Sequence, residues 1–147
     1  GKSIEEVRDY VEENRLHICH WFTVEDLSHL KRGGRISAAT ALIGTMLNIK
    51  PVLRVDDEGH LVNVGKARGR RASLTALVDH MEKSAIDTAS QTVFISHGDS
   101  QEDADFVAEE IKKRMGVKKV ITNYMGPVIG THAGPGAIAL FFLGDKR

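Results

Sequence analysis

The chain has 147 residues, of which 41% are hydrophobic and 27% are charged, and its 20 basic side chains balance its 20 acidic ones. This length and composition predict one soluble globular domain and exclude an intrinsically disordered chain. A formal net charge of zero argues against a protein that coats nucleic acid or an anionic membrane.

The single cysteine, Cys19, excludes an internal disulfide framework and favours a reducing, cytoplasmic location. No apolar run reaches the roughly 18 residues of a membrane span, so no integral membrane contact is expected. The sequence begins at Gly1 without a methionine and enters a helical pattern at once. We therefore expect a fragment of a longer protein.

Three helix starts are marked by a hydroxyl residue followed three positions later by an acidic residue, a pattern that caps the first turn. They are Ser3 with Glu6, Thr23 with Asp26 and Ser100 with Asp103. Apolar periodicity and turn residues predict the elements in chain order: a helix over 4–14, a strand over 16–22, a short helix through 30 that stops at Gly33 and Gly34, a buried helix over 38–47, a hairpin of strands 51–55 and 60–64, a helix around 74–81, a strand over 92–96, a helix over 101–115 that ends at Gly116, and strands over 117–122 and 137–143.

This alternation of helices and strands predicts an α/β fold with a β-sheet of five to six strands flanked by helices. The hairpin and the last strand indicate a mixed sheet. No repeat, low-complexity stretch or internal linker divides residues 1–147, which favours a single domain.

Most familiar motifs of cofactor and metal sites are absent, including glycine-rich nucleotide loops and paired cysteines. Only His17 and His20 lie at metal-ligand spacing, and residues three apart on a strand point to opposite faces of a sheet. We therefore predict no metal and no cofactor.

The first informative stretch is residues 27–37, which contains Gly33-Gly34-Arg35. A double glycine can turn with positive φ, and an arginine on such a turn can bind a carboxylate or a phosphate through two hydrogen bonds. Cations at the end of a helix also complement its dipole. That simpler explanation is preferred for Lys31 and Arg32, whereas for Arg35 both explanations stay open.

The second stretch, residues 66–71, places four cations between the hairpin and the next helix. They can receive an anionic group, but a solvated charged face is the preferred interpretation. Nucleic acid is disfavoured because no aromatic residues lie between the cations.

The third stretch, residues 125–137, is rich in glycine and proline and predicts a fixed, closely approached loop. His132 is the titratable side chain of this loop, and its imidazole can bind an acid headgroup or act as a base. His97, at the end of a predicted strand, is a secondary candidate because sites of α/β proteins gather at strand ends.

Together these stretches resemble the C-terminal half of the DegV family of bacterial fatty-acid-binding proteins. The resemblance rests on Leu27-x-x-Leu30-Lys31-x-Gly33-Gly34-Arg35-Ile36-Ser37, on Leu47-Asn48-Ile49-Lys50-Pro51-Val52-Leu53, on Asp57-Glu58-Gly59 with Lys66-x-Arg68, and on residues 126–136. It implies that residues 1–147 are the C-terminal domain of a two-domain DegV-like fold. Residues 1–15 would then be a helix entering from a missing N-terminal domain.

The resemblance also implies that Arg35, Arg68 and His132 face the carboxylate of a long-chain fatty acid, with Arg70 as an alternative to Arg68. The acyl chain needs an apolar lining, for which residues of the predicted helix over 38–47 are candidates, unless that helix is ordinary core, and the small residues among them would leave room. These candidates are Ala38, Ala41, Leu42, Thr45 and Met46. Cations near the mouth would be available for a partner or a product phosphate, namely Lys31, Arg32, Arg70 and Arg71.

The function that this resemblance implies is a non-catalytic, lipid-binding carrier. It would present the fatty acid to a separate, dihydroxyacetone-kinase-like fatty acid kinase subunit that forms an acyl phosphate. One alternative is a dihydroxyacetone-kinase-like enzyme subunit that uses His132 or His97 on a small polar substrate. Another is an interaction module that uses residues 66–71.

Overall fold

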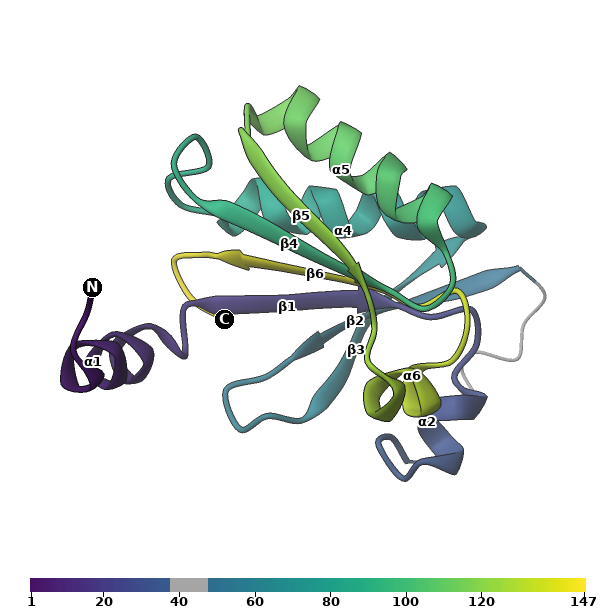
Figure 1. The fold of residues 1–147 in the computed structure, drawn as a ribbon. Coiled ribbons are helices and arrows are strands. Elements are labelled where there is room, and N and C mark those ends of the chain that lie inside the picture. The colour runs from purple at the N-terminus through teal and green to yellow at the C-terminus, as the bar shows by residue number, and fades with distance from the viewer. Residues whose placement is uncertain (38–47) are drawn as a thin grey trace.

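The computed structural model describes residues 1–37 and 48–147 (Figure 1). The predicted buried helix over 38–47, with its five candidate lining residues, lies outside the described residues. The elements in chain order are α1 (Ile4–Asn14), β1 (Ile18–Thr23), α2 (Ser28–Arg32), β2 (Ile49–Val55), β3 (Leu61–Arg68), α4 (Arg70–Ser84), β4 (Thr92–His97), α5 (Gln101–Met115), β5 (Lys119–Tyr124), α6 (Pro127–Ala133) and β6 (Ile138–Leu143).

The strands form one six-stranded sheet in the order β3-β2-β1-β6-β4-β5. Only β4 and β5 run parallel among these neighbouring strands, while the other pairs are antiparallel. The prediction of a mixed α/β sheet is confirmed. The last strand, β6, lies in the middle of the sheet between β1 and β4.

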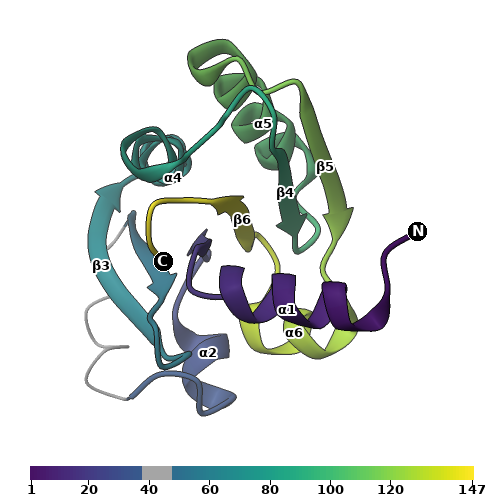
Figure 2. The same cartoon turned by 90° about the vertical axis from the view of Figure 1, so that its left-hand side faces the viewer.

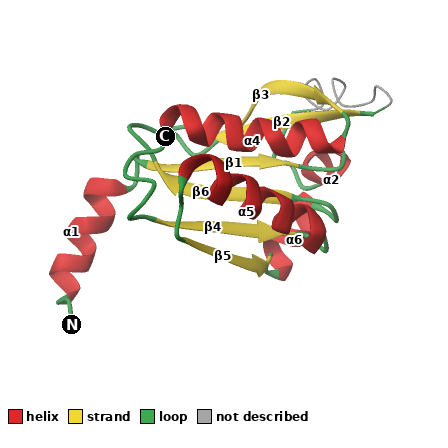
Figure 3. Cartoon of the chain, turned by 90° about the horizontal axis from the view of Figure 1, so that it is seen from above, coloured by secondary structure: helices red, strands yellow, loops and turns green. Residues whose placement is uncertain are grey.

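Helices α4 and α5 cover one face of the sheet (Figures 1 and 3). Side chains of β6 alternate, so that Ile138, Leu140 and Phe142 are buried in the core under these helices. The apolar positions predicted for α4 are all buried there, namely Leu74, Leu77, Val78 and Met81. The predicted apolar stripe of α5 is buried against the same core at Ala104, Val107, Ala108 and Ile111.

The opposite face of the sheet is covered differently. Helices α2 and α6 lie at one end of it and α1 lies at the other end (Figures 1 and 2). The capping box of Ser3 and Glu6 is confirmed at the start of α1. No residue of α1 is buried, and Ile4 is 81% exposed. Among the described helices, none combines the length and the apolar character that crossing a bilayer requires.

The capping prediction for Thr23 is wrong. Thr23 is the last residue of β1, where its buried hydroxyl donates a hydrogen bond to the Pro51 carbonyl oxygen (2.7 Å). A buried hydroxyl needs such a partner, and the neighbouring strand supplies it. Helix α2 instead begins at Ser28, whose backbone N–H donates to the Asp26 carboxylate (2.6 Å). Ser100 also differs from expectation, because its hydroxyl donates to the Asp103 carboxylate (2.7 Å) and no side-chain capping bond forms.

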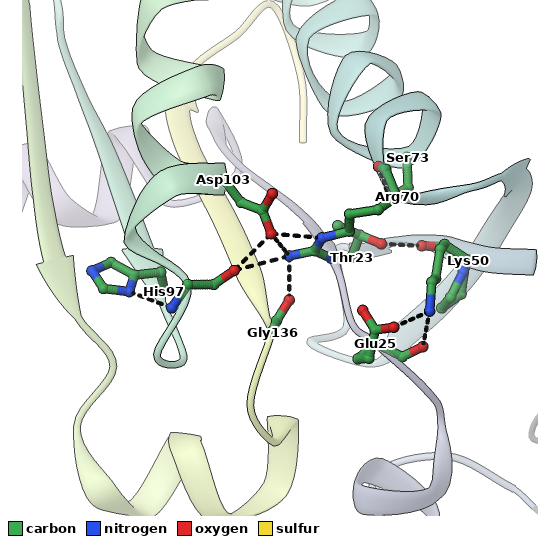
Figure 4. A network of polar contacts seen from close by, with 10 residues as sticks. Thr23, Glu25, Lys50, Arg70, Ser73, His97, Asp103 and Gly136 are labelled. Carbon is green, nitrogen blue, oxygen red and sulfur yellow. Dashed lines mark hydrogen bonds and ion pairs between the residues drawn. The ribbon is translucent and has the colours of Figure 1, made fainter. Parts of the chain in front are cut away.

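The prediction that the cationic stretch 66–71 is a connecting loop is wrong, because β3 continues to Arg68 and α4 begins at Arg70. Gly69 between them adopts φ 90°, which turns the chain from strand to helix. Arg70 then points toward α5, where its Nε donates to the Asp103 carboxylate (2.8 Å) and its Nη2 donates to the Gly136 carbonyl oxygen (Figure 4). The guanidinium of Arg71 lies 3.8 Å from the centre of the Phe106 ring, also on α5.

Replacing Arg70 by glutamine is expected to lower the free energy of unfolding by about 1–2 kcal/mol at neutral pH. Burial raises the pKa of Asp103, but hydrogen bonds from Ser100 and Arg70 outweigh it and hold this pKa below its ordinary value. The stabilisation by the Arg70–Asp103 pair is therefore fully present above the ordinary carboxyl pKa. It is lost as the pH falls through the pKa of Asp103 in the folded state.

Urea unfolding at several pH values checks this prediction. The difference between wild type and R70Q is expected to shrink below about pH 4. The control is Lys83→Gln, which removes an exposed cation of the same helix. A difference that is as large in acid as at neutral pH would contradict the role of the Arg70–Asp103 pair.

Candidate functional site

A pocket of about 360 Å³ opens on the face of the sheet opposite to α4 and α5. Residues of the strands β1, β2, β3, β4 and β6 and of the helices α2 and α6 form its wall, together with residues next to the two helices. Most of the wall is apolar, including Phe22, Leu61, Met125, Val128, Ile129 and Phe141. The pocket can therefore hold an apolar chain.

Among the described residues, four polar side chains also line this pocket, namely His20, Arg35, Ser96 and His132. Arg35 and His132 are the two that sequence analysis selected as headgroup residues. The structure brings them together at one wall although they lie far apart in the chain. A guanidinium and an imidazole beside an apolar cavity match an amphipathic ligand with an acid headgroup.

Gly33 is the residue at which Arg35 and His132 converge. The Arg35 Nη1 donates a hydrogen bond to the Gly33 carbonyl oxygen (2.7 Å). A Cβ atom added to Gly33 would lie 2.1 Å from the His132 Nδ1, so the ring occupies the space that any side chain would need. Gly34 then adopts φ 70°, which confirms the predicted turn with positive φ, and the Arg35 backbone N–H donates to the Leu30 carbonyl oxygen (2.8 Å).

The stretch 125–137 contains a helix, so its prediction as a loop throughout is wrong. Pro127 occupies the first turn of α6, where its fixed φ suits a helix and its missing N–H costs no hydrogen bond. The predicted close approach is confirmed at Gly134, which follows the helix with φ 81°. A Cβ atom added there would lie 2.6 Å from the Cδ2 atom of His29 on α2.

The strands supply a part of the wall that was not predicted from the sequence. His20 of β1 pairs with Phe141 of β6, and their rings meet edge to face at 5.2 Å. Burial, and then the positive charge of Arg147, lower the pKa of His20, so this ring is neutral at pH 7. The signal for these residues is strand alternation, since His20 and Phe22 share one face of β1.

The structure does not bring Arg68 into this wall. Arg68 is exposed at the end of β3 and pairs with Ile49, whereas Leu61 at the start of β3 lines the pocket. Arg70 and Arg71 contact α5 on the opposite face of the sheet. The roles that the resemblance implies for these three arginines stay predictions.

His97 also lies away from the pocket. It is fully buried at the end of β4, and its Nδ1 accepts a hydrogen bond from the Ser100 backbone N–H (3.1 Å, Figure 4). Its ring contacts Tyr124 at 4.3 Å between ring centres. Neighbouring strand residues face opposite ways, so Ser96 lines the pocket while His97 points to the other face.

A second hollow of about 520 Å³ lies at the α1 end of the same face. Tyr10 of α1 contributes to its wall, together with Phe94 and Phe141. Because Phe141 lines both hollows, an apolar surface runs along this face from the Arg35 end toward α1.

Comparison with known proteins identifies the family. A sequence model described as "Uncharacterised protein, DegV family COG1307" matches residues 1–145. The DegV domain-containing protein CPE0026 of Clostridium perfringens is 50% identical over 147 residues, which is 100% of this chain and 50% of that protein. The chain therefore spans about half the length of the curated relatives it matches.

Solved structures agree with this match. A DegV family protein from Thermus thermophilus, described for its fatty acid binding, superposes with a TM-score of 0.85 at 30% identity and covers 98% of this chain and 51% of that one. The fatty acid kinase (Fak) B3 protein of Streptococcus pneumoniae, loaded with linoleic acid, shares the fold with a TM-score of 0.88 at 21% identity over 99% and 51% of the two chains. The predicted resemblance is confirmed, and the chain belongs to the DegV family.

Proposed function

We propose that this chain binds a long-chain fatty acid, with the carboxylate held by Arg35 and His132 and the acyl chain against the apolar wall. The observation that carries the proposal is their convergence on Gly33 at the edge of an apolar pocket. The Thermus thermophilus relative, described as a fatty acid binder, supports the same ligand class.

The two ends of the ligand are recognised by different forces. A charge-assisted hydrogen bond from Arg35 to the carboxylate is worth about 1.5–3 kcal/mol. Each methylene removed from water adds about 0.8 kcal/mol, which makes the apolar wall the larger contributor for a long chain. Arg68 is the proposed second arginine of the headgroup site. Its neighbour Ala67 packs against the core under α4 and α5, so by strand alternation Arg68 faces the side of the sheet that carries the pocket.

The finer proposal is that the bound acid is presented to a separate, dihydroxyacetone-kinase-like kinase subunit. Arg35 is exposed, so a carboxylate beside it would be open to a partner protein. The Streptococcus pneumoniae protein of the same fold is described as a fatty acid kinase protein loaded with linoleic acid. In this role the chain is a carrier and the partner supplies the catalysis.

The histidine-based enzyme stays an alternative prediction. Intact-protein mass spectrometry after incubation with dihydroxyacetone would test it, since an adduct on His132 or His97 would favour an enzyme over a carrier.

Titration of the delipidated chain with oleate, followed by displacement of a fluorescent fatty acid, tests the binding proposal. Arg35→Gln and His132→Gln are each expected to weaken oleate binding by about tenfold, the effect of losing one charge-assisted hydrogen bond. Lys118→Gln removes an exposed cation just before β5, at the opposite end of that strand from Met125, and should not change the affinity. Failure of the wild type to bind, or variants within twofold of it, would refute the headgroup assignment.

A further inference from the structure

A further cleft, separate from the two hollows described above, also has His132 in its wall. Its volume is about 520 Å³, and the side chains of His29, Arg32, Thr131 and His132 line it together with Gly33 and Gly134. His132 therefore stands in the walls of both cavities. One side of the ring faces an apolar pocket, and the other side faces a cleft with cationic and hydrogen-bonding groups.

The two glycines hold the imidazoles of this cleft close to the backbone. His132 of α6 lies over Gly33 at the end of α2, and His29 of α2 lies over Gly134 at the end of α6. The arrangement is reciprocal, so each ring is fixed by the absence of a side chain on the other element. Donors fixed in this way need little reorganisation when an anion binds.

The hydrogen bond between Arg32 and His29 sets the proton position of His29. The Arg32 Nη2 lies 3.1 Å from the His29 Nδ1, and a guanidinium can only donate. A neutral His29 ring with this bond accepts at Nδ1 and carries its proton on Nε2, from which it can donate to a ligand. The other N–H groups of the exposed Arg32 side chain can donate as well.

The cleft also has an excess of positive charge. In the part of the chain that the structure describes, the ion pairs involve neither Lys31 nor Arg32 nor Arg35. Of the nearby acids, Glu25 pairs with Lys50, while Asp26 accepts a hydrogen bond from the Ser28 backbone N–H and interacts electrostatically with His29 and Arg32. In the described part of the chain, the lining of the cleft therefore contains the permanent cation Arg32 and no carboxylate.

We propose that this cleft binds a phosphate dianion, either inorganic phosphate or the phosphate of a monoester, through His29, Arg32 and His132. Three donors from two helices match the several acceptor oxygens of a tetrahedral dianion. The phosphate proposal rests on the residues of this cleft and does not require that the chain bind a fatty acid. Because the two cavities share His132, however, occupancy of one should change the affinity of the other by the same factor in both directions.

Imidazole proton NMR of the full chain, titrated with inorganic phosphate at constant ionic strength, tests this proposal. We expect saturable shifts of the His29 and His132 ring protons, while those of His60, exposed beside the β2–β3 turn, stay unchanged. Arg32→Gln should weaken phosphate binding by about tenfold, and Arg32→Lys, which keeps the charge but not the fork of donors, by less. Lys83→Gln, with the same loss of charge on the opposite sheet face, should bind as wild type does.

Hexyl phosphate distinguishes the source of the anion. Tighter binding of hexyl phosphate than of inorganic phosphate would identify a monoester as the ligand, and equal or weaker binding would identify free phosphate. Shifts that never saturate, or that Lys83→Gln and Arg32→Gln reduce equally, would overturn the proposal by showing general charge attraction only.

Oleate titration of R32Q separates this inference from the proposed function. We expect the oleate affinity of R32Q to stay within about twofold of wild type when phosphate is absent, and its thermal unfolding to be unchanged. Saturable phosphate binding in a chain that does not bind oleate would refute only the proposed function. Oleate binding without saturable phosphate shifts would refute only the phosphate cleft.

Discussion

Replacing Gly33 by alanine is expected to weaken oleate binding by at least about tenfold while changing the free energy of unfolding by less than about 1 kcal/mol. The added Cβ atom would lie 2.1 Å from the His132 Nδ1, so the ring must leave its place in the pocket wall. The backbone itself tolerates alanine, because Gly33 has φ −76° and ψ −3°. The expected loss is therefore one of ligand geometry and not of folding.

Gly130→Ala is the matched control for this variant. Gly130 lies inside α6, and a Cβ atom added there meets no atom within 4 Å. That variant should bind oleate as wild type does and should be slightly more stable, because alanine favours a helix over glycine. If G33A also bound oleate with wild-type affinity, the position of His132 over Gly33 would be irrelevant to the headgroup.

Local sequence patterns predict the elements well where one face of an element is buried. The four apolar positions of α4 and the left-handed Gly116 at the end of α5 are examples. The same reasoning ends β3 too early, because Lys66 and Arg68 are charged. An edge strand tolerates such exposed charges, since it needs hydrogen bonds to one neighbour only.

Helix α6 shows why the glycine-rich stretch could not be predicted as a helix. Its first residue, Pro127, and its central residue, Gly130, are of types with low helix propensity. Packing against α2 stabilises the turn of helix all the same, through the apposition of His132 with Gly33 and of His29 with Gly134. This contact joins segments far apart in the chain, and local patterns carry no information about it.

The candidate site was predictable in part. The motif resemblance selects Arg35 and His132, and the structure places both at one pocket. The resemblance does not indicate which strand residues line the pocket, because both faces of β1 carry large side chains. Trp21 stacks on His80 of α4 at 3.8 Å between ring centres, while His20 and Phe22 face the pocket. Only the register of β1 with β6 shows which face is which.

The same register places two adjacent residues of β6 on opposite faces of the sheet, so their substitution should affect stability and oleate binding differently. Leu140 is fully buried under α4 and α5, whereas the neighbouring Phe141 is half-buried and lines the pocket. Leu140→Ala is expected to lower the free energy of unfolding by about 2–5 kcal/mol, from lost burial and the cavity left behind. Phe141→Ala should cost less stability, about 1–2 kcal/mol, because its ring keeps one side toward solvent.

Oleate binding should rank the same two variants in the opposite order. Phe141→Ala removes apolar wall and the edge-to-face partner of His20, so its oleate affinity should fall by about tenfold. Leu140→Ala, measured below its own unfolding temperature, should bind oleate as wild type does, because its side chain faces the helices. Urea unfolding and oleate titration of both variants check the pair. Equal losses of affinity would mean that the acyl chain does not lie against the open face of the sheet.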